Sequence, residues 1–218
     1  RNPALCYGLR ILTNYGQSRV PGEGARKTDD RLSIRNRFLY RPWGGDQLRL
    51  FGNLNLESQF TPGYEYEAGP EGEDIRISDF FAPAYFTQNA GLAWLPSGNL
   101  SFEAGLGLKQ TLVSDTSLST RYGLDPGRKI RGEAGYTTGI TYEAGIWENV
   151  VYTGYLETFT NFSRPLKRTD VVFSNRLTGR INNILNLTFQ FEMIYDDDFS
   201  RKLQLSQVLS AGLVFVIF

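Results

Sequence analysis

The sequence predicts an all-β protein, a transmembrane up-and-down antiparallel β-barrel with ten strands visible. Three observations carry this prediction: apolar and polar residues alternate with period 2, short and long links alternate between the strands, and aromatic residues gather near the links. The 218 residues suffice for one barrel, so we expect a single domain over residues 1–218.

Ten alternating segments account for most of the chain. In the clearest one, residues 185–193, leucine, phenylalanine and methionine alternate with asparagine, threonine, glutamine and glutamate. Several segments exceed the ~5–6 residues of globular strands and reach the ~9–11 that a tilted membrane strand needs. The segments lie near 4–14, 31–42, 47–60, 84–95, 99–113, 130–146, 149–162, 169–181, 185–195 and 203–218.

The links between these segments form a second pattern. Tight turns are predicted at 43–46, 96–98, 147–149 and 182–184, and long polar links at 15–30, 61–83, 114–129, 163–168 and 196–202. Outer-membrane barrels have short periplasmic turns and longer extracellular loops. We therefore expect the tight turns and the C-terminus in the periplasm and the long links outside the cell.

The aromatic residues supply a third pattern. The three tryptophans each lie beside a tight turn, whereas several tyrosines lie beside or within the long links. Amphipathic rings favour the headgroup level, so the pattern predicts two aromatic girdles. The predicted girdle residues are Trp43, Trp94, Trp147, Tyr15 and Tyr195. The last segment ends on Phe218 and resembles the signal read by the outer-membrane insertion machinery.

One face of the predicted strands carries charges of both signs. On the lipid face each would cost ~2–4 kcal/mol at the bilayer midplane, so we expect them to line the lumen. The predicted lumen-lining charges are Arg35, Arg37, Arg49, Glu57, Glu103, Lys109, Arg131, Glu133, Glu143, Glu157, Arg176, Arg180 and Glu192. Such a lumen can be a packed polar core, a small aqueous pore or a ligand site.

A few polar residues fall where the alternation requires apolar ones. Asn36, Gln88 and Asn175 occupy such positions, and Gly52 lies on the segment between the first two. Asn36, Gly52 and Gln88 form a candidate patch for a partner protein. The alternative is a β-bulge that shifts the alternation by one residue.

The composition argues against several classes of function. The chain has no histidine and one cysteine, Cys6, which removes intrachain disulfides, His/Cys zinc sites and Ser-His or Cys-His nucleophile pairs. Lys+Arg and Asp+Glu balance at 23 each, so nothing favours nucleic acid, and no apolar run approaches the ~18 residues of a membrane helix. Three aspartates at 196–198 are a candidate calcium site or a solvated turn.

Several stretches resemble a family of unknown function, domain of unknown function 3078, whose members are predicted outer-membrane proteins of Bacteroidota and their relatives. The stretches are 60–64, 78–85, 156–162, 194–198 and 207–218, so the resemblance runs from about residue 5 to the end. It implies an outer-membrane barrel and no activity or catalytic residue. Such proteins usually begin with a further hairpin, which implies about twelve strands in the intact protein.

The sequence thus leads us to expect a non-enzymatic, cofactor-free and metal-free protein of a Gram-negative outer membrane. Its expected partners are the lipid bilayer, the insertion machinery during assembly and other outer-membrane proteins. A structural or partner-binding barrel with a charge-packed lumen is the first hypothesis, and a narrow channel for small polar solutes is the alternative. A soluble β-sandwich would also alternate, but it leaves the strand lengths, the links and the tryptophans unexplained.

Overall fold

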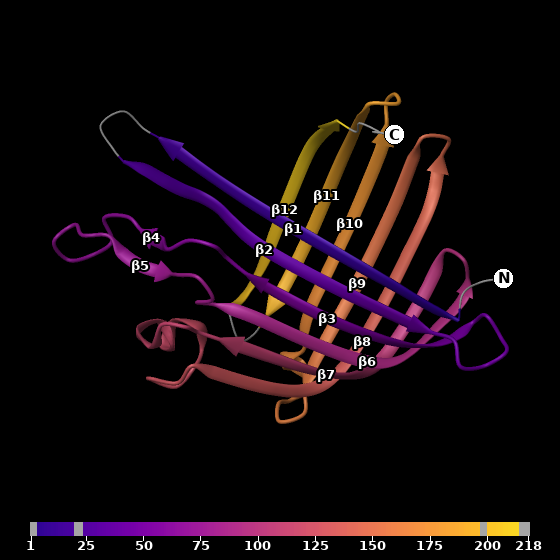
Figure 1. Ribbon diagram of the computed structural model, residues 1–218, viewed down its shortest axis with the longest axis horizontal. Coiled ribbons are helices and arrows are strands. Elements are labelled where there is room, and N and C mark those ends of the chain that lie inside the picture. Colours follow the sequence, from indigo (N-terminus) through magenta and orange to yellow (C-terminus); the bar gives the residue numbers. More distant parts are fainter. Residues whose placement is uncertain (1–3, 20–23, 197–199, 214–218) are drawn as a thin grey trace. The chain divides into compact units, whose positions relative to one another are not determined.

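The computed structural model describes residues 4–19, 24–196 and 200–213 and is all-β (Figure 1). The strands are β1 (Leu5–Arg19), β2 (Ala25–Tyr40), β3 (Leu48–Ser58), β4 (Gly63–Glu65), β5 (Ile75–Ser78), β6 (Ala84–Ser97), β7 (Leu100–Leu112), β8 (Ile130–Trp147), β9 (Val150–Asn161), β10 (Asp170–Arg180), β11 (Leu185–Asp196) and β12 (Ser200–Leu213). Three short 3₁₀ turns accompany them: η1 (Thr116–Leu118), η2 (Thr120–Tyr122) and η3 (Leu166–Arg168).

Ten of these strands form one sheet in the order β1-β2-β3-β6-β7-β8-β9-β10-β11-β12, and β4 and β5 form a small hairpin of their own. The ten predicted strands and their antiparallel arrangement are confirmed. The sandwich alternative is wrong for the described residues, because a sandwich needs two large sheets packed face to face. In the described part of the chain, no helix is long and apolar enough to cross a membrane.

The predicted links are correct in the middle of the chain and wrong towards its ends. β1 runs to Arg19 and β2 starts at Ala25, so most of the link predicted at 15–30 is strand. β12 likewise starts at Ser200, inside the link predicted at 196–202. Polar residues can extend a strand, because ladder hydrogen bonds join backbone groups whatever the side chains are. Short and long links therefore do not alternate without exception.

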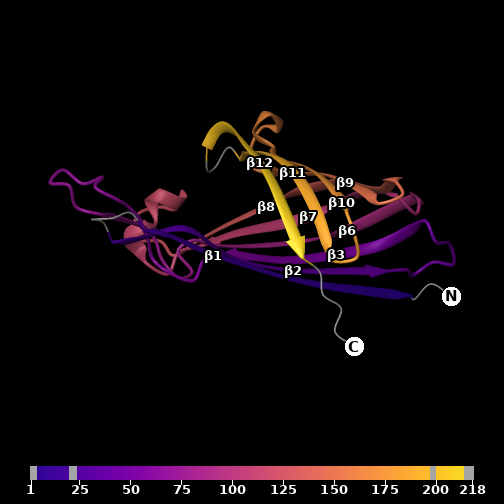
Figure 2. The same cartoon turned by 90° about the horizontal axis from the view of Figure 1, so that it is seen from above.

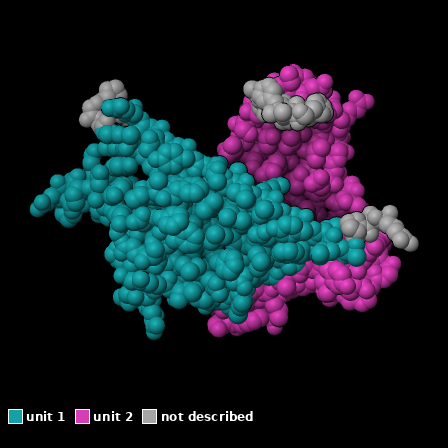
Figure 3. All heavy atoms as spheres, viewed as in Figure 1, with its two compact units in different colours: residues 1–39, 52–89, 108–134 teal, residues 40–51, 90–107, 135–218 magenta. Residues whose placement is uncertain are grey.

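The described residues fall into two compact units, coloured in Figure 3. Unit 1 comprises 1–39, 52–89 and 108–134, and unit 2 comprises 40–51, 90–107 and 135–218. Strands β3, β6, β7 and β8, and β2 through its last residue Tyr40, contribute residues to both. The expected single domain over residues 1–218 stays a prediction.

Unit 2 contains a regular antiparallel meander from β8 to β12 (Figures 1 and 2). Each strand pairs with the next one in the chain, and β10 pairs with β11 over ten consecutive positions from Val171 to Arg180. The register shifts at two places only within the described pairs of this meander, at 145–147 of β8 and at 194–196 of β11. Between these bulges, directly opposite residues share a face, so the register defines two faces.

In unit 1, the link before β6 and the link after β7 pack against each other. Their small apolar core consists of Ala82, Val113, Leu118 and Leu124, with Tyr122 packed against it. The Tyr122 hydroxyl donates to the carbonyl of Ile77 on β5 at 2.7 Å, and burial raises the pKa of this hydroxyl. The link predicted at 114–129 is thus a folded element.

Candidate functional site

One face of the β8–β12 meander carries no charged residue at the paired positions between the two bulges. At the paired positions of this apolar face, from Tyr136 to Ala211, neither Asp, Glu, Lys nor Arg occurs. Its residues are Tyr136, Thr138, Ile140, Tyr142, Ala144, Trp147, Val150, Tyr152, Gly154, Leu156, Thr158, Thr160, Val171, Phe173, Asn175, Leu177, Gly179, Leu185, Leu187, Phe189, Phe191, Met193, Tyr195, Leu205, Gln207, Leu209 and Ala211.

Large side chains of this apolar face are exposed. Leu209 is 67% exposed and Phe189 is 42% exposed, and Leu187 and Leu205 are exposed as well. By contrast, the largest fully buried side chains among the described residues are Val113, Thr111 and Ser119, which are small or polar. A soluble protein shows the opposite distribution, because burial of large apolar side chains drives its folding.

Between the two bulges, the opposite, polar face of the meander carries all the charges of the paired positions. These are Glu143, Glu157, Asp170, Arg176, Arg180 and Glu192. A further paired charge, Asp196 opposite Ser200, lies beyond the bulge of β11. The Arg176 guanidinium donates to Gln190 at 3.2 Å, and that of Arg180 donates to Asn149 at 3.3 Å. The Tyr155 hydroxyl donates to the Glu157 carboxylate. Arg176, Arg180 and Glu157 therefore have hydrogen-bond partners close by.

In unit 1, β2 and β3 place three charges together. The guanidinium groups of Arg31 and Arg35 lie 3.3 and 2.8 Å from the same Glu57 oxygen, and the Ser33 hydroxyl is also in contact with it. All three ionic side chains are about a third to a half exposed, so their attraction is partly screened by solvent. Next along β2, Arg37 donates to Asn53 at 3.4 Å.

The other predicted lumen charges lie at separate places. Arg131 donates to Glu133 at 3.0 Å and to the Gly123 carbonyl at 3.0 Å, and the Glu133 side chain is 6% exposed. Arg49 donates to the backbone carbonyl of Asp46 in the β2–β3 turn. Glu103 and Lys109 lie on β7, half-buried. Arg35 with Glu57 and Arg131 with Glu133 are thus pairs among the predicted residues, while lumen lining itself stays a prediction.

The two amides of the predicted partner patch hydrogen-bond to neighbouring residues. Asn36 accepts from the Tyr7 hydroxyl at 2.6 Å and donates to the Leu54 carbonyl, and Gln88 donates to Gln110 at 3.5 Å. A methyl group at Gly52 would touch only a backbone carbonyl, at 4.0 Å.

The alternation at Asn36 is regular. Arg35 and Arg37 on either side of it both contact β3 side chains, so Asn36 points to the opposite side of the sheet. A bulge therefore does not explain this position. Asn175, on the apolar face, is satisfied in the same manner as Asn36, by the hydroxyl of Tyr152.

The sequence interpretation missed the partners of these polar residues. Gln110 falls at an apolar-face position of β7, and the alternation over 100–112 could have identified it. Thr138 and Thr158, whose hydroxyl oxygens lie 2.7 Å apart, form another closed pair on the apolar face.

The aromatic residues lie near strand ends. On the apolar face of unit 2, Trp147 lies at the end of the meander where β8 ends and β9 begins, and Tyr195 lies at the other end. Tyr136 and Phe162, in edge-to-face contact at 4.7 Å, lie at the same end as Tyr195. Trp94 stacks on Phe102 at 5.5 Å and is exposed.

The remaining girdle residues differ from this arrangement in part. Trp43 lies in the β2–β3 turn and is exposed. Tyr15 is also exposed, but it lies within β1 and not in a long link as predicted.

In the described ranges, no cluster of three or more Asp, Glu, Cys or His side chains could hold a metal ion. Asp197 and Asp198 of the calcium hypothesis lie outside the described residues, as does Phe218. Cys6 is half-buried in β1 as a free thiol.

The strand order and the two contrasting faces of β8–β12 define a class, an all-β protein with a single large antiparallel sheet, part of which is apolar on one side and polar on the other. Residues 4–64 match a family described as "Protein of unknown function (DUF3078)". The predicted resemblance is confirmed over β1, β2, β3 and the start of the next link, but this match is narrower than predicted. No curated protein and no solved structure matches the chain significantly.

Proposed function

We propose that the chain is an integral outer-membrane protein whose sheet closes into a barrel, with the apolar face towards lipid and the polar face towards the lumen. The observation that carries the proposal is the absence of charge from the paired positions of the apolar face between the two bulges, opposite a face that bears six charges there. An alternating lipid-facing and lumen-facing pattern is typical of such barrels.

The exposed leucines and phenylalanines give this pattern its energetic meaning. Contiguous apolar surface of this extent is rare on soluble monomers and promotes aggregation in water. In hydrocarbon the same surface is favourable, provided that every backbone group has a partner within the protein. Closure of the sheet would provide those partners for the edge strands β1 and β12.

The few polar side chains on the apolar side fit the same environment. The amide of Asn175 accepts from Tyr152, and the hydroxyls of Thr138 and Thr158 bond to each other. Because each group finds its partner within the sheet, lipid contact would leave fewer unsatisfied polar groups.

For the interior, a packed polar scaffold is our first candidate. Arg31, Arg35 and Glu57 share one cluster, and Arg176 donates to Gln190, so these lumen-side groups engage each other in place of a solute. We propose that this barrel serves a structural or partner-binding role in the envelope of a Gram-negative bacterium such as a member of Bacteroidota.

The test of membrane insertion is refolding of the full chain from urea into phospholipid vesicles. The expected result is a heat-modifiable band on a denaturing gel and protection of β8–β12 from added protease. A chain that stays soluble without lipid, or that gives the same protease pattern with and without vesicles, contradicts the proposal.

A narrow channel is the second candidate, and the mixed charge of the polar face favours it. Single-channel recording in a planar bilayer separates the two candidates. A folded barrel that gives no conductance steps supports the scaffold. Steps whose size changes in Arg35→Gln or Glu143→Gln variants support the channel.

The partner-binding role has its own test at the predicted patch. The double variant Asn36→Leu plus Gln88→Leu removes the two amides of the predicted patch and should shrink a native complex without unfolding the barrel. A complex of unchanged size on a native gel contradicts this role for the patch.

A further inference from the structure

Unit 1 contains a cavity of about 300 Å³ between the ends of β1 and β2 and the link that carries β4. Its lining includes three tyrosines, Tyr15, Tyr64 and Tyr66, together with the polar residues Gln17, Lys27 and Asp74. This volume is at the lower end of the roughly 300–1,000 Å³ typical of small-molecule sites. Several aromatic walls with a few polar groups are the usual composition of such sites.

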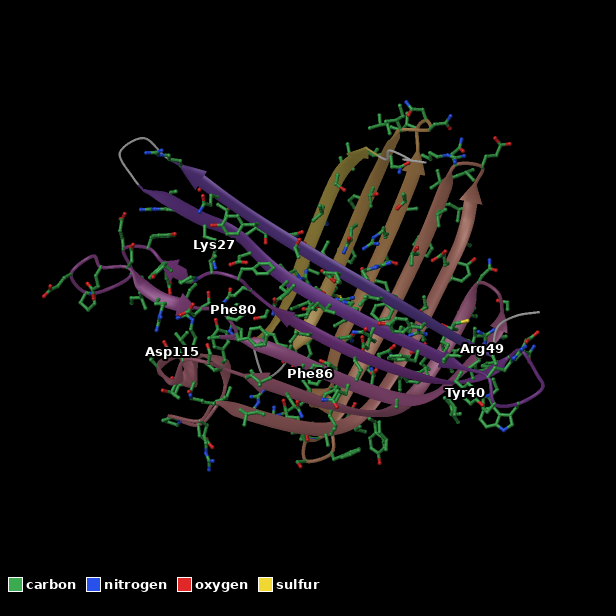
Figure 4. The ribbon with its side chains drawn as sticks, viewed as in Figure 1. Lys27, Tyr40, Arg49, Phe80, Phe86 and Asp115 are labelled. Carbon is green, nitrogen blue, oxygen red and sulfur yellow. The ribbon has the colours of Figure 1, made fainter. Side chains whose placement is uncertain are left out.

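The floor of this cavity is held by Lys27, which Figure 4 labels on β2. The Lys27 ammonium donates to Asp30 at 3.1 Å and to the Thr61 carbonyl at 2.8 Å. The Asp30 carboxylate, 1% exposed, also accepts from the backbone amides of Phe60 and Thr61. The link after β3 is therefore fixed to β2 by several charge-assisted hydrogen bonds.

Gly63, in the link after β3, lies close to Ser78 and to Lys27. A methyl group there would lie 2.3 Å from the Ser78 hydroxyl oxygen and 3.2 Å from the Lys27 nitrogen. A larger residue at this position would therefore have to displace the Ser78 side chain and push against Lys27.

The tyrosines are oriented by contacts of their own. The Tyr66 hydroxyl accepts from the Lys27 backbone amide at 3.2 Å, and the Arg26 guanidinium lies over its ring at 4.6 Å. The Gln17 side chain donates to the Tyr15 hydroxyl at 2.6 Å. Since Arg26 covers Tyr66, the rings of Tyr15 and Tyr64, which are 56% and 41% exposed, are the open walls.

The charges at the cavity do not favour an anion. Lys27 is paired with Asp30 and Arg26 with Glu67, and the Asp74 carboxylate lines the cavity. A phosphate or carboxylate ligand would meet this negative group without an uncommitted lysine. A neutral ligand with hydroxyl groups and a flat apolar side suits the lining better.

A pyranose ring has this chemistry. Its C–H groups are slightly positive and pack on the negative face of an aromatic ring, while its hydroxyls bond to amide and carboxylate groups. We propose that this tyrosine-lined cavity binds a neutral saccharide, with Tyr15 and Tyr64 as stacking platforms and Gln17 and Asp74 as hydrogen-bonding partners. This binding role goes beyond the proposed scaffold.

The test is isothermal titration of the full chain, folded in detergent micelles, with three probes. Maltohexaose and an N-acetylglucosamine hexamer represent free polysaccharide, and the deacylated core oligosaccharide of lipopolysaccharide represents sugar carried on a lipid. We expect at least one probe to bind with a Kd in the millimolar range or tighter. The probe that binds identifies the source of the saccharide.

Tyrosine variants decide whether the cavity is responsible. Tyr64→Ala and Tyr15→Ala should each weaken binding about ten-fold, because a stacking surface is lost, whereas Tyr64→Phe should change it by less than about two-fold. Tyr136→Ala, an exposed tyrosine of unit 2, is the matched control and should bind like the parent chain. Far-UV circular dichroism confirms that each variant is folded.

Two outcomes overturn the inference. One is that none of the three probes binds the folded parent chain. The other is that Tyr64→Ala binds as well as the parent chain, in which case the tyrosines only anchor the protein at an interface. The assay needs no bilayer, so its failure leaves membrane insertion untouched, and failure to insert into vesicles leaves saccharide binding untouched.

Discussion

Phe189, on β11, offers the sharpest test of which face meets lipid. It lies opposite Leu177 of β10 and Leu209 of β12, while its neighbour Thr188 lies on the polar face opposite Thr178 and Ser210. Adjacent residues of one strand thus report on two environments. The proposed perturbations are Phe189→Ala, Phe189→Arg and Thr188→Arg.

The expected magnitudes follow from exposure. Phe189 is 42% exposed, and for a side chain of ~200 Å² this is roughly 80 Å² of lipid contact, or ~2 kcal/mol at 25 cal/mol per Å². Phe189→Ala should therefore cost at least ~2 kcal/mol. Arginine at the same position should cost a further ~2–4 kcal/mol, because it places a charge in hydrocarbon.

The matched change Thr188→Arg should cost under ~1 kcal/mol, since a polar, wet or charge-paired surface accepts a guanidinium. The assay is reversible urea unfolding of the chain folded in phospholipid vesicles, followed by tryptophan fluorescence. Equal free energies of unfolding for Phe189→Arg and Thr188→Arg would refute the assignment of the two faces.

Three further changes test other parts of the molecule. Glu57→Gln removes the carboxylate shared by two arginines and should cost ~0.5–1 kcal/mol, a loss that shrinks in high salt; a loss independent of salt contradicts the ionic interpretation. Tyr122→Phe removes the hydroxyl that donates to β5 and should cost ~1 kcal/mol and speed proteolysis of the 113–129 link; unchanged cleavage argues against this contact. Gly91→Ala places a methyl group 2.2 Å from the Ala104 carbonyl oxygen and should lower the free energy of unfolding in urea by ~1–3 kcal/mol. The control Gly145→Ala has open space around it and should lower this free energy by less. Equal losses of stability in the two variants would contradict the close contact between β6 and β7 at Gly91.

Strands with one apolar face and one polar face were predictable from the sequence, because their residues alternate in polarity. Over 185–193 the alternation is uninterrupted, and β11 begins at the predicted residue and ends one residue beyond the predicted segment. The end of β1 and the beginning of β2 were not predicted, because Gly16, Gln17 and Lys27 lie among polar residues. Backbone hydrogen bonds between strands do not depend on the side-chain pattern, so alternation does not reveal them.

Among the candidate sites, too, some residues could have been predicted from the sequence and others could not. Gln110 could have been found, since it interrupts an apolar face within a single strand. The cavity around Tyr66 could not, because its hydroxyl meets a backbone amide 39 residues away, at Lys27, and that contact depends on how the link folds. Contacts between distant segments carry no periodicity, so alternation cannot predict them.

The strand order has a consequence for how the chain comes together. Apart from the β4–β5 hairpin, which lies in the link between β3 and β6, every strand of the large sheet pairs with the strands next to it in the chain. Each pairing step within the observed sheet therefore joins segments separated by one link, so the loop-closure entropy of such a step is small. Because an antiparallel hairpin satisfies the backbone groups between its two strands as it forms, the sheet can grow by one hairpin at a time, with a single unpaired edge at each front.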